Sequence, residues 1–175
     1  FTDAGTANLN KDLTGDIDLI AIGGVDAVVN LSNDQTITGS ITAAGNGQGI
    51  VNVLGNGQFD STIGITGTVV RSISELNLNT YDAAQDDSSA VFTTTLHGDT
   101  YANSVNLNNG ATLELIDGVD VTGNIYSYVD ASLAPIAEDL EADPVVNAAT
   151  GDEYTKNILD IQGSSVITGD VGTFS

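Results

Sequence analysis

A five-residue motif that recurs along the chain is the feature that most constrains its fold. It consists of a branched apolar residue, Thr, Gly, a polar residue and a second branched apolar residue, and we call it the TG motif. Its six copies occupy residues 13–17, 37–41, 65–69, 96–100, 121–125 and 167–171. The fourth copy is degenerate, with His97 in place of Thr and Thr100 in place of the closing apolar residue. The motif glycines are 24, 28, 31, 25 and 46 residues apart, which indicates a period near 24 with insertions of variable length.

A second motif lies between the copies of the first. It reads apolar, Asn or Asp, apolar, and we call it the N motif; its copies are residues 29–31, 51–53, 76–78, 105–107 and 159–161. Both motifs alternate with period two, so in a strand their apolar side chains face one way and their polar side chains the other. The central Gly of the TG motif either faces inward where space is short or marks a bend at a corner.

Stacking such repeats at the ~4.8 Å spacing of neighbouring strands would build parallel sheets with apolar columns inside and Asn and Thr ladders outside. We therefore expect an all-β fold, a parallel β-helix or β-solenoid of about six irregular coils, in one domain over residues 1–175. Turn-rich clusters at residues 44–47, 55–57 and 108–110 are the expected coil corners. The alternative is a sandwich of antiparallel hairpins, since Asn-Gly also favours hairpins, but a sandwich does not require one motif in every strand.

The longest interruption of the repeats lies between Val129 and Lys156. It is acidic and rich in Ala, and it contains Pro135 and Pro144. We expect an inserted loop over about residues 130–156, with a short helix possible at residues 136–142 between the two prolines. A smaller excursion covers residues 81–89. Such loops often carry the distinctive recognition surface of a repeat protein.

Charge excludes several classes of partner. The chain has a formal net charge of −21, with 24 acidic residues and only three basic ones, Lys11, Arg71 and Lys156. Nucleic acid and anionic membrane surfaces are therefore not expected to bind. Copies of the chain repel one another unless salt or divalent cations screen them, and both are plentiful outside cells. We expect an extracellular or bacterial cell-surface protein, secreted and then processed, because no initiating Met and no signal peptide open the sequence.

Two further absences narrow the class of protein. No apolar run approaches the ~18 residues of a transmembrane helix, so the chain is not expected to span a membrane. The sequence contains no Cys, which excludes a disulfide scaffold.

We expect no enzyme. A polysaccharide lyase needs a Lys or Arg close to acidic groups, whereas the three basic residues fall in different repeats. A hydrolase with Asp residues on adjacent coils is the remote alternative, but Asp16 and Asp99 share a motif position three repeats apart. His97 is the only histidine and is expected to occupy an outward position that tolerates any polar residue.

No cofactor is expected except calcium, for which the chain offers many carboxylates. The candidate ligands form three groups: Asp82, Asp86 and Asp87; Asp117 and Asp120; and Glu138, Asp139, Glu141 and Asp143. None of them matches an EF-hand loop or the nonapeptide of calcium-binding β-rolls. An acidic surface without a specific metal is the alternative.

Residues 121–125, 166–172 and 108–115 resemble the passenger repeats of bacterial autotransporter adhesins, including the large rickettsial surface antigens. The similarity extends over most of the chain outside residues 129–156. The resemblance implies export across the bacterial envelope, a parallel β-helix, and work as an adhesin, a surface coat or a structural fibre.

Two functions follow as hypotheses. The first is an extracellular structural protein that assembles head to tail with copies of itself into a fibre, sheath or surface layer. We expect this because the sequence ends on a full TG motif without a capping helix, and unpaired strand edges promote association. The second is an adhesin module that binds host or neighbouring cells through its inserted loops.

Overall fold

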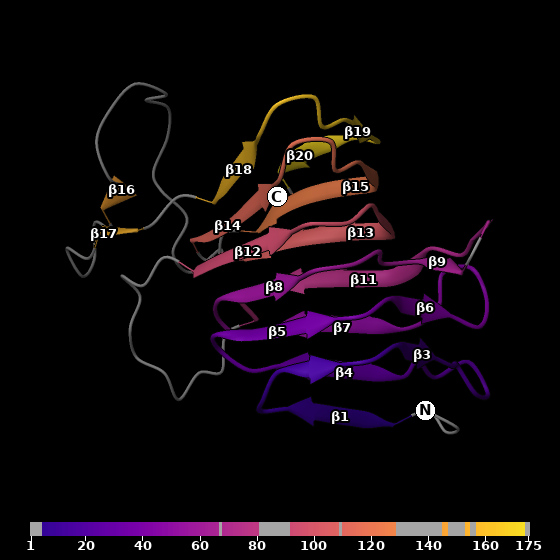
Figure 1. Cartoon of the computed structure of the whole chain (residues 1–175). Coiled ribbons are helices and arrows are strands. Elements are labelled where there is room, and N and C mark those ends of the chain that lie inside the picture. Colours follow the sequence, from indigo (N-terminus) through magenta and orange to yellow (C-terminus); the bar gives the residue numbers. More distant parts are fainter. Residues whose placement is uncertain are drawn as a thin grey trace.

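The chain is all-β. Its computed structural model describes residues 5–66, 68–80, 92–108, 110–128, 145–146, 153–154 and 157–173. Within these ranges every regular element is a strand and none is a helix. Most strands pair in parallel and form stacked sheets (Figure 1). The predicted all-β class and the parallel pairing are therefore confirmed.

The largest sheet has eight strands, all paired in parallel. In spatial order they are β1 (Thr6–Leu9), β4 (Val28–Leu31), β7 (Ile50–Val53), β11 (Ile73–Leu78), β13 (Thr100–Asn108), β15 (Val121–Tyr128), and then β19 (Ile167–Thr168) and β20 (Val171–Thr173), which both pair with β15. Its register aligns the Asn of each strand with the Asn of the next, from Asn8 in β1 to Asn106 in β13. Stacking of the first four N motifs is thus confirmed.

A second parallel sheet has six strands. They are β2 (Leu13–Thr14), β5 (Gln35–Thr38), β8 (Gly57–Phe59), β12 (Phe92–Leu96), β14 (Ala111–Leu115) and β18 (Ile158–Ile161). A third row of residues begins with the parallel pair β3 (Ile17–Leu19) and β6 (Ile41–Ala43). Ile63 extends this row, because it bridges Ile41 on one side and Thr100 of β13 on the other.

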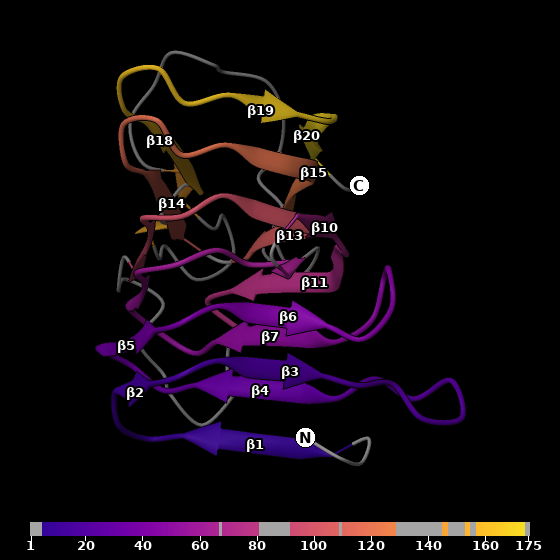
Figure 2. The ribbon, with the colours of Figure 1, turned by 45° about the vertical axis from the view of Figure 1, so that its right-hand side comes forward.

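The chain visits these three groups of strands in a repeating order. From the largest sheet it enters the second sheet, passes to the third row and returns, as in β1, β2, β3 and β4 and again in β5, β6 and β7. Successive passes lie one above another (Figure 2). This arrangement is compatible with a β-solenoid.

Side chains that point between the sheets form one apolar core. The alternation predicted from the motifs is visible in β4, where Val29 and Leu31 are fully buried and Asn30 between them is half-buried. Leu31 aligns with Val53, and Val53 with Leu78, so buried side chains of the same column touch from one strand to the next. Burial of these branched residues is the main stabilising contribution, at about 1.5–3 kcal/mol for each side chain.

The TG motifs do not all occupy one position, contrary to our expectation. The first two copies stack in register, Leu13 on Ile37 and Ile17 on Ile41. The third copy instead forms an antiparallel hairpin of β9 (Ile65–Thr66) and β10 (Val69–Val70). Its place in the stack is taken by residues 59–63, which keep an apolar residue at each end. The last two copies pair with each other in the largest sheet, along β15.

Several described motif glycines mark bends, and at two of these bends neighbouring backbones approach closely. Gly39 and Gly169 have φ of 151° and 150°, in a region that L side chains rarely adopt. A Cβ at Gly39 would collide with the carbonyl of Gly15, and one at Gly169 with the carbonyl of Gly123. Of the two alternatives left by the sequence, a bend is found at every described motif glycine except Gly123, which lies within β15.

Two more segments depart from the expected stack. The fifth N motif, residues 159–161, lies in β18 of the second sheet and not beside the other four, because it pairs with β14. Within the long insertion the structure describes only an antiparallel pair, β16 (Val145–Val146) and β17 (Glu153–Tyr154). The expected helix at residues 136–142 lies outside the described residues.

Candidate functional site

The most distinctive surface among the described residues is the end of the stack formed by β18, β19 and β20, which we call the C-terminal edge. Two of its apolar side chains continue buried columns but are themselves exposed, whereas Leu159 and Ile167 are partly buried. Ile161 aligns with the fully buried Leu115, yet it is 45% exposed. Val171 aligns with Ile125, which is 3% exposed, yet it is 59% exposed. Ile161 and Val171 are branched apolar residues like those of the core, but no described strand covers them.

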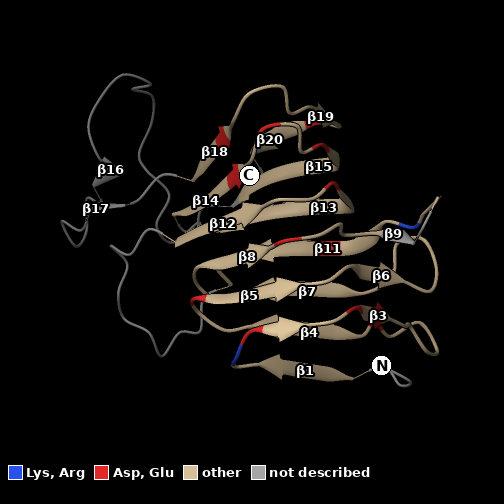
Figure 3. Cartoon of the chain, in the orientation of Figure 1, with Lys and Arg blue, Asp and Glu red and all other residues tan. Residues whose placement is uncertain are grey.

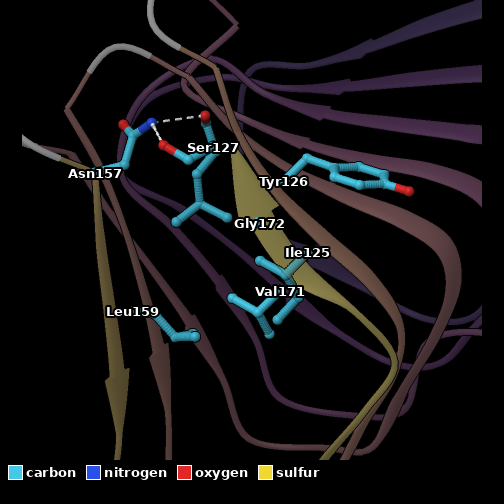
Figure 4. Close-up of a pocket in the computed structure, with 8 residues that line it drawn as sticks. Ile125, Tyr126, Ser127, Asn157, Leu159, Val171 and Gly172 are labelled. Atoms are coloured by element: carbon cyan, nitrogen blue, oxygen red, sulfur yellow. Dashed lines mark hydrogen bonds between the residues drawn. The ribbon is translucent and has the colours of Figure 1, made fainter. Parts of the chain in front are cut away.

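An open cleft of about 480 Å³ enters the stack at this edge. Its apolar lining comes from the core side of the two sheets, with Leu107, Ile125, Leu159 and Val171 (Figure 4). Its remaining lining residues are Tyr126, Ser127, Asn157 and Gly172. The cleft is therefore the uncovered end of the core, with a polar group on one side.

Asn157 holds the two sheets together beside this cleft. Its Oδ1 accepts hydrogen bonds from the backbone N–H groups of Gly110 (2.8 Å) and Ala111 (3.0 Å). Its Nδ2 donates to the carbonyl of Leu107 and to Oγ of Ser127, both at 2.8 Å (Figure 4). Asn157 follows the long insertion directly, where the chain returns to the stack. Its side-chain amide forms hydrogen bonds with backbone groups of the preceding turn. Sequence analysis did not single out Asn157, because no motif contains it.

The opposite end of the stack, formed by β1, β2 and β3, is the N-terminal edge. Leu9 of β1 and Leu13 of β2 are partly buried and pack against the core. They align with Leu31 and Ile37, both fully buried one rung further in. The column of Leu13 ends on Ile161 at the C-terminal edge, whereas the column of Leu9 ends on Thr173. Lys11 lies between β1 and β2 (Figure 3).

A ladder of Asn side chains runs along the outer face of the largest sheet. Each Nδ2 donates to the Oδ1 of the preceding strand: Asn30 to Asn8 and Asn52 to Asn30 at 2.8 Å, Asn77 to Asn52 at 2.9 Å, and Asn106 to Asn77 at 2.6 Å. Asn8, which belongs to residues 7–9, is a copy of the N motif that sequence analysis missed. The ladder ends where Tyr126 aligns with Asn106, and Oδ1 of Asn106 is buried without a hydrogen bond.

Many acidic and Asn side chains cap backbone N–H groups of the following pass at the corners. Asp16 accepts from Ser40 at 2.8 Å, and Asp120 accepts from Val166 at 2.9 Å. The same arrangement recurs for Asp12, Asp26, Asn33, Asn46, Asn56, Asp99, Asp117 and Asn124. The six Asp residues among them are a quarter of the 24 acidic residues of the chain, and all ten side chains connect successive repeats. Asp16, Asp99 and Asn124 hold the polar position of the TG motif, whereas the others lie between strands, where alternation gives no signal.

The candidate calcium ligands divide between described and undescribed residues. Asp117 and Asp120 lie at corners, where each accepts a backbone hydrogen bond. The N–H and the hydroxyl of Ser164 hold the pKa of Asp117 below its ordinary value, the N–H having the larger effect. Among the described residues no group of three or more His, Cys, Asp and Glu could hold a metal ion. The other seven candidates fall outside the described residues: Asp82, Asp86, Asp87, Glu138, Asp139, Glu141 and Asp143.

The basic residues and the histidine are well separated. Lys11 lies between β1 and β2, and Arg71 lies between β10 and β11. The Arg71 guanidinium donates to the carbonyl of Ala44 at 2.6 Å. His97 is exposed beside β12, and its backbone N–H donates to the carbonyl of Phe59. Lys156 lies outside the described residues. The structure thus brings no described basic side chain to an acidic cluster.

Comparisons with known proteins add no relative. The chain matches no protein-family model, no curated protein and no solved structure. In the described part of the chain there is no helix with the length and apolar character needed to cross a membrane.

Proposed function

We propose that this chain is a parallel β-solenoid with closed three-sided coils, and that its role is structural. It works outside the cell or at the bacterial surface, and it assembles end to end through its exposed strand edges into a fibre, sheath or surface layer. The observation that carries the proposal is the C-terminal edge. There, Ile161 and Val171 are about half exposed, although the residues that they align with are buried.

The physical reason is that each edge lacks one partner. A parallel strand at the edge of a sheet has free backbone N–H and C=O groups that can pair with another strand. The apolar columns add a hydrophobic gain when a further rung covers them. Because the two ends of the stack differ, contact between them is head to tail and does not close, so it grows a filament.

The surface charge supports an extracellular setting. A net charge of −21 opposes association of copies, and the opposition falls when salt or divalent cations screen it. Assembly would then begin where cations are abundant. The role proposed is not enzymatic, and calcium acts in it as a screening ion.

The experiment compares purified wild-type chain with two single variants, by negative-stain imaging and light scattering, in low salt, in sodium chloride and in calcium chloride. V171D places a charge on the C-terminal edge, and we expect it to stay monomeric. V69D makes the same change at a residue that is 51% exposed on the β9–β10 hairpin, away from both edges. We expect wild type and V69D to form elongated particles in salt. Monodisperse wild-type monomers under all conditions would overturn the proposal.

A second candidate function is adhesion through loops that leave the stack. Two described turns carry exposed apolar side chains: Ile22 (46%) and Val25 (61%) in one, and Val69 and Val70 in the β9–β10 hairpin. Backbone hydrogen bonds between Ile22 and Val25 hold the first turn in shape. If the chain is an adhesin that binds through this turn, the I22S/V25S variant should bind cells less than wild type, with an unchanged circular dichroism spectrum. Equal binding by the two proteins would contradict a role for this turn.

A further inference from the structure

We propose that the junction between two copies continues the internal register of the stack, so that β20, β18 and β19 of one copy pair in parallel with β1, β2 and β3 of the next. This inference rests on the proposed function and specifies its geometry. It places Val171 against Ala7, Ile161 against Leu13, and Ile167 against Ile17 of the second copy.

Three unbroken columns define this register. Each column follows one inward position from the N-terminal edge to the C-terminal edge. The first, in the largest sheet, contains Ala7, Val29, Val51, Leu76, Val105, Ile125 and Val171. The second contains Leu13, Ile37, Phe59, Leu96, Leu115 and Ile161. The third contains Ile17, Ile41, Ile63, Thr100, Val121 and Ile167.

Both ends of each column are apolar, and this makes a second copy a fitting occupant. Every described strand along the columns runs parallel to its neighbour, so the N-terminal edge of one copy offers the strand direction that the C-terminal edge of another requires. Each edge presents one strand from the largest sheet, one from the second sheet and one from the third row, so all three strands of one edge find a partner on the other. A register shifted by one residue would point the apolar side chains of the edge strands outward. The proposed register is therefore favoured over registers that differ from it by one residue.

On its outer face the junction lacks the amide bonds that join the first five strands of the largest sheet. Gly172 aligns with Tyr126, which aligns with Asn106, so Gly172 occupies the ladder position at the C-terminal edge. In the junction it stands opposite Asn8, and the amide ladder has no bond there. On the second sheet Asp160 stands opposite Asp12, because Ile161 meets Leu13. These two carboxylates repel, so the junction depends on salt.

Cysteine pairing tests the register directly, because the native chain contains no Cys. The N8C/G172C variant places the two thiols opposite each other across the junction. Neighbouring parallel strands are about 4.8 Å apart, within the Cα separation that a disulfide spans. Gly172 has open space at its Cβ position, and Asn8 is exposed. We expect mild oxidation of this variant, under assembling salt, to yield a ladder of covalent multimers on a non-reducing gel.

Three control variants distinguish disulfides formed across the proposed junction from disulfides formed by random encounters between molecules. N8C and G172C alone lack a partner thiol across the junction and should give little product. N52C/G172C carries one thiol in the middle of the same ladder and should not form the series of multimers. Filaments of the N8C/G172C variant without a disulfide ladder would overturn the register while leaving end-to-end assembly intact. Failure of the wild-type chain to assemble at all would instead overturn the proposed function.

Discussion

Glycine at the corners determines how closely two passes of the chain can approach. Gly15 and Gly39 align one above the other and both have positive φ, of 139° and 151°. They differ in surroundings, since a Cβ at Gly15 would have open space and one at Gly39 would meet the Gly15 carbonyl. A side chain at Gly15 would therefore have only an unfavourable backbone conformation, whereas a side chain at Gly39 would also collide with neighbouring backbone.

Alanine substitutions at the two positions should differ in their cost. G15A forces only an unfavourable φ, and we expect it to lower the free energy of unfolding by about 1–2 kcal/mol. G39A adds a collision with backbone that cannot easily move, and we expect a total loss of about 3 kcal/mol or more. Urea denaturation monitored by circular dichroism measures both. G172A, with open space and no positive φ, is the matched neutral variant; equal costs for G15A and G39A would contradict the collision.

Asp117 should make stability depend on pH in the acid range. Its pKa is lowered in the folded chain by the hydrogen bonds from Ser164, so folding favours the ionised carboxylate. The resulting stabilisation is complete above the ordinary pKa of 3.8 and is lost as the pH falls through the lowered value. We expect wild type to exceed D117N in urea midpoint at neutral pH, and the difference to shrink below pH ~4. A difference that stays constant down to pH ~2 would contradict this role.

At the scale of the element, the Asn ladder ties five strands of the largest sheet to one another. All four amide bonds point the same way, each Nδ2 donating toward the N-terminal edge. Asn52 both donates and accepts within the ladder, whereas Asn8 at its end accepts one bond from a more exposed position.

Removing a rung from the middle of the ladder should cost more than removing its end. N52A loses two side-chain hydrogen bonds, and we expect it to lower the free energy of unfolding by about 2 kcal/mol. N8A loses one bond at an exposed site, and we expect a loss below about 1 kcal/mol. Thermal or urea unfolding of the two variants provides the comparison. A similar, small effect at both positions would show that the ladder contributes little to stability.

Period-two patterns were sufficient to predict the parallel sheets but not the position of every motif. Four N motifs predicted the largest sheet, because each repeats the same inward and outward positions. The third TG motif was misplaced because residues 59–63, which contain no Gly, supply the same apolar spacing and occupy its position. Residues 159–161 were misplaced because β14 carries the same alternation, Leu113, Glu114 and Leu115, in the second sheet.

The candidate site was less predictable than the sheets. Ile161 and Val171 have the sequence pattern of core residues, and only the position of their strands at the C-terminal edge exposes them. Asn157 makes four hydrogen bonds to groups 30 to 50 residues away in sequence, and no local pattern encodes such contacts.

At the scale of the whole molecule, negative charge opposes the contacts that the apolar edges favour. The chain has a net charge of −21, and 14 of its 24 acidic residues lie in the described part, with carboxylates along the stack (Figure 3). Within a subunit six carboxylates accept hydrogen bonds from backbone N–H groups, but in the proposed assembly the carboxylates of different subunits repel one another. We therefore expect ionic strength to control the proposed assembly.

Reversing one charge at the junction should shift the salt dependence of assembly. D160K places a Lys opposite Asp12 of the next copy, and we expect assembly at low salt to strengthen by about two- to five-fold in association constant. E75K makes the same change in net charge in the middle of the largest sheet, away from the junction. Light scattering across a salt titration measures both variants. An equal shift for D160K and E75K would show that net charge alone is responsible.

The gap in the amide ladder at Gly172 has a mechanical consequence. Neighbouring strands are joined by backbone hydrogen bonds that lie along the axis of the stack, so tension along that axis loads successive rungs in series. A chain of bonds in series yields at its weakest link. The contact between copies has neither the Asn bonds that join the first five strands nor the peptide connection that links successive passes within a subunit. A fibre of this protein would lengthen under load by parting between whole subunits, and each subunit would keep its coils and be able to rejoin when the load is released.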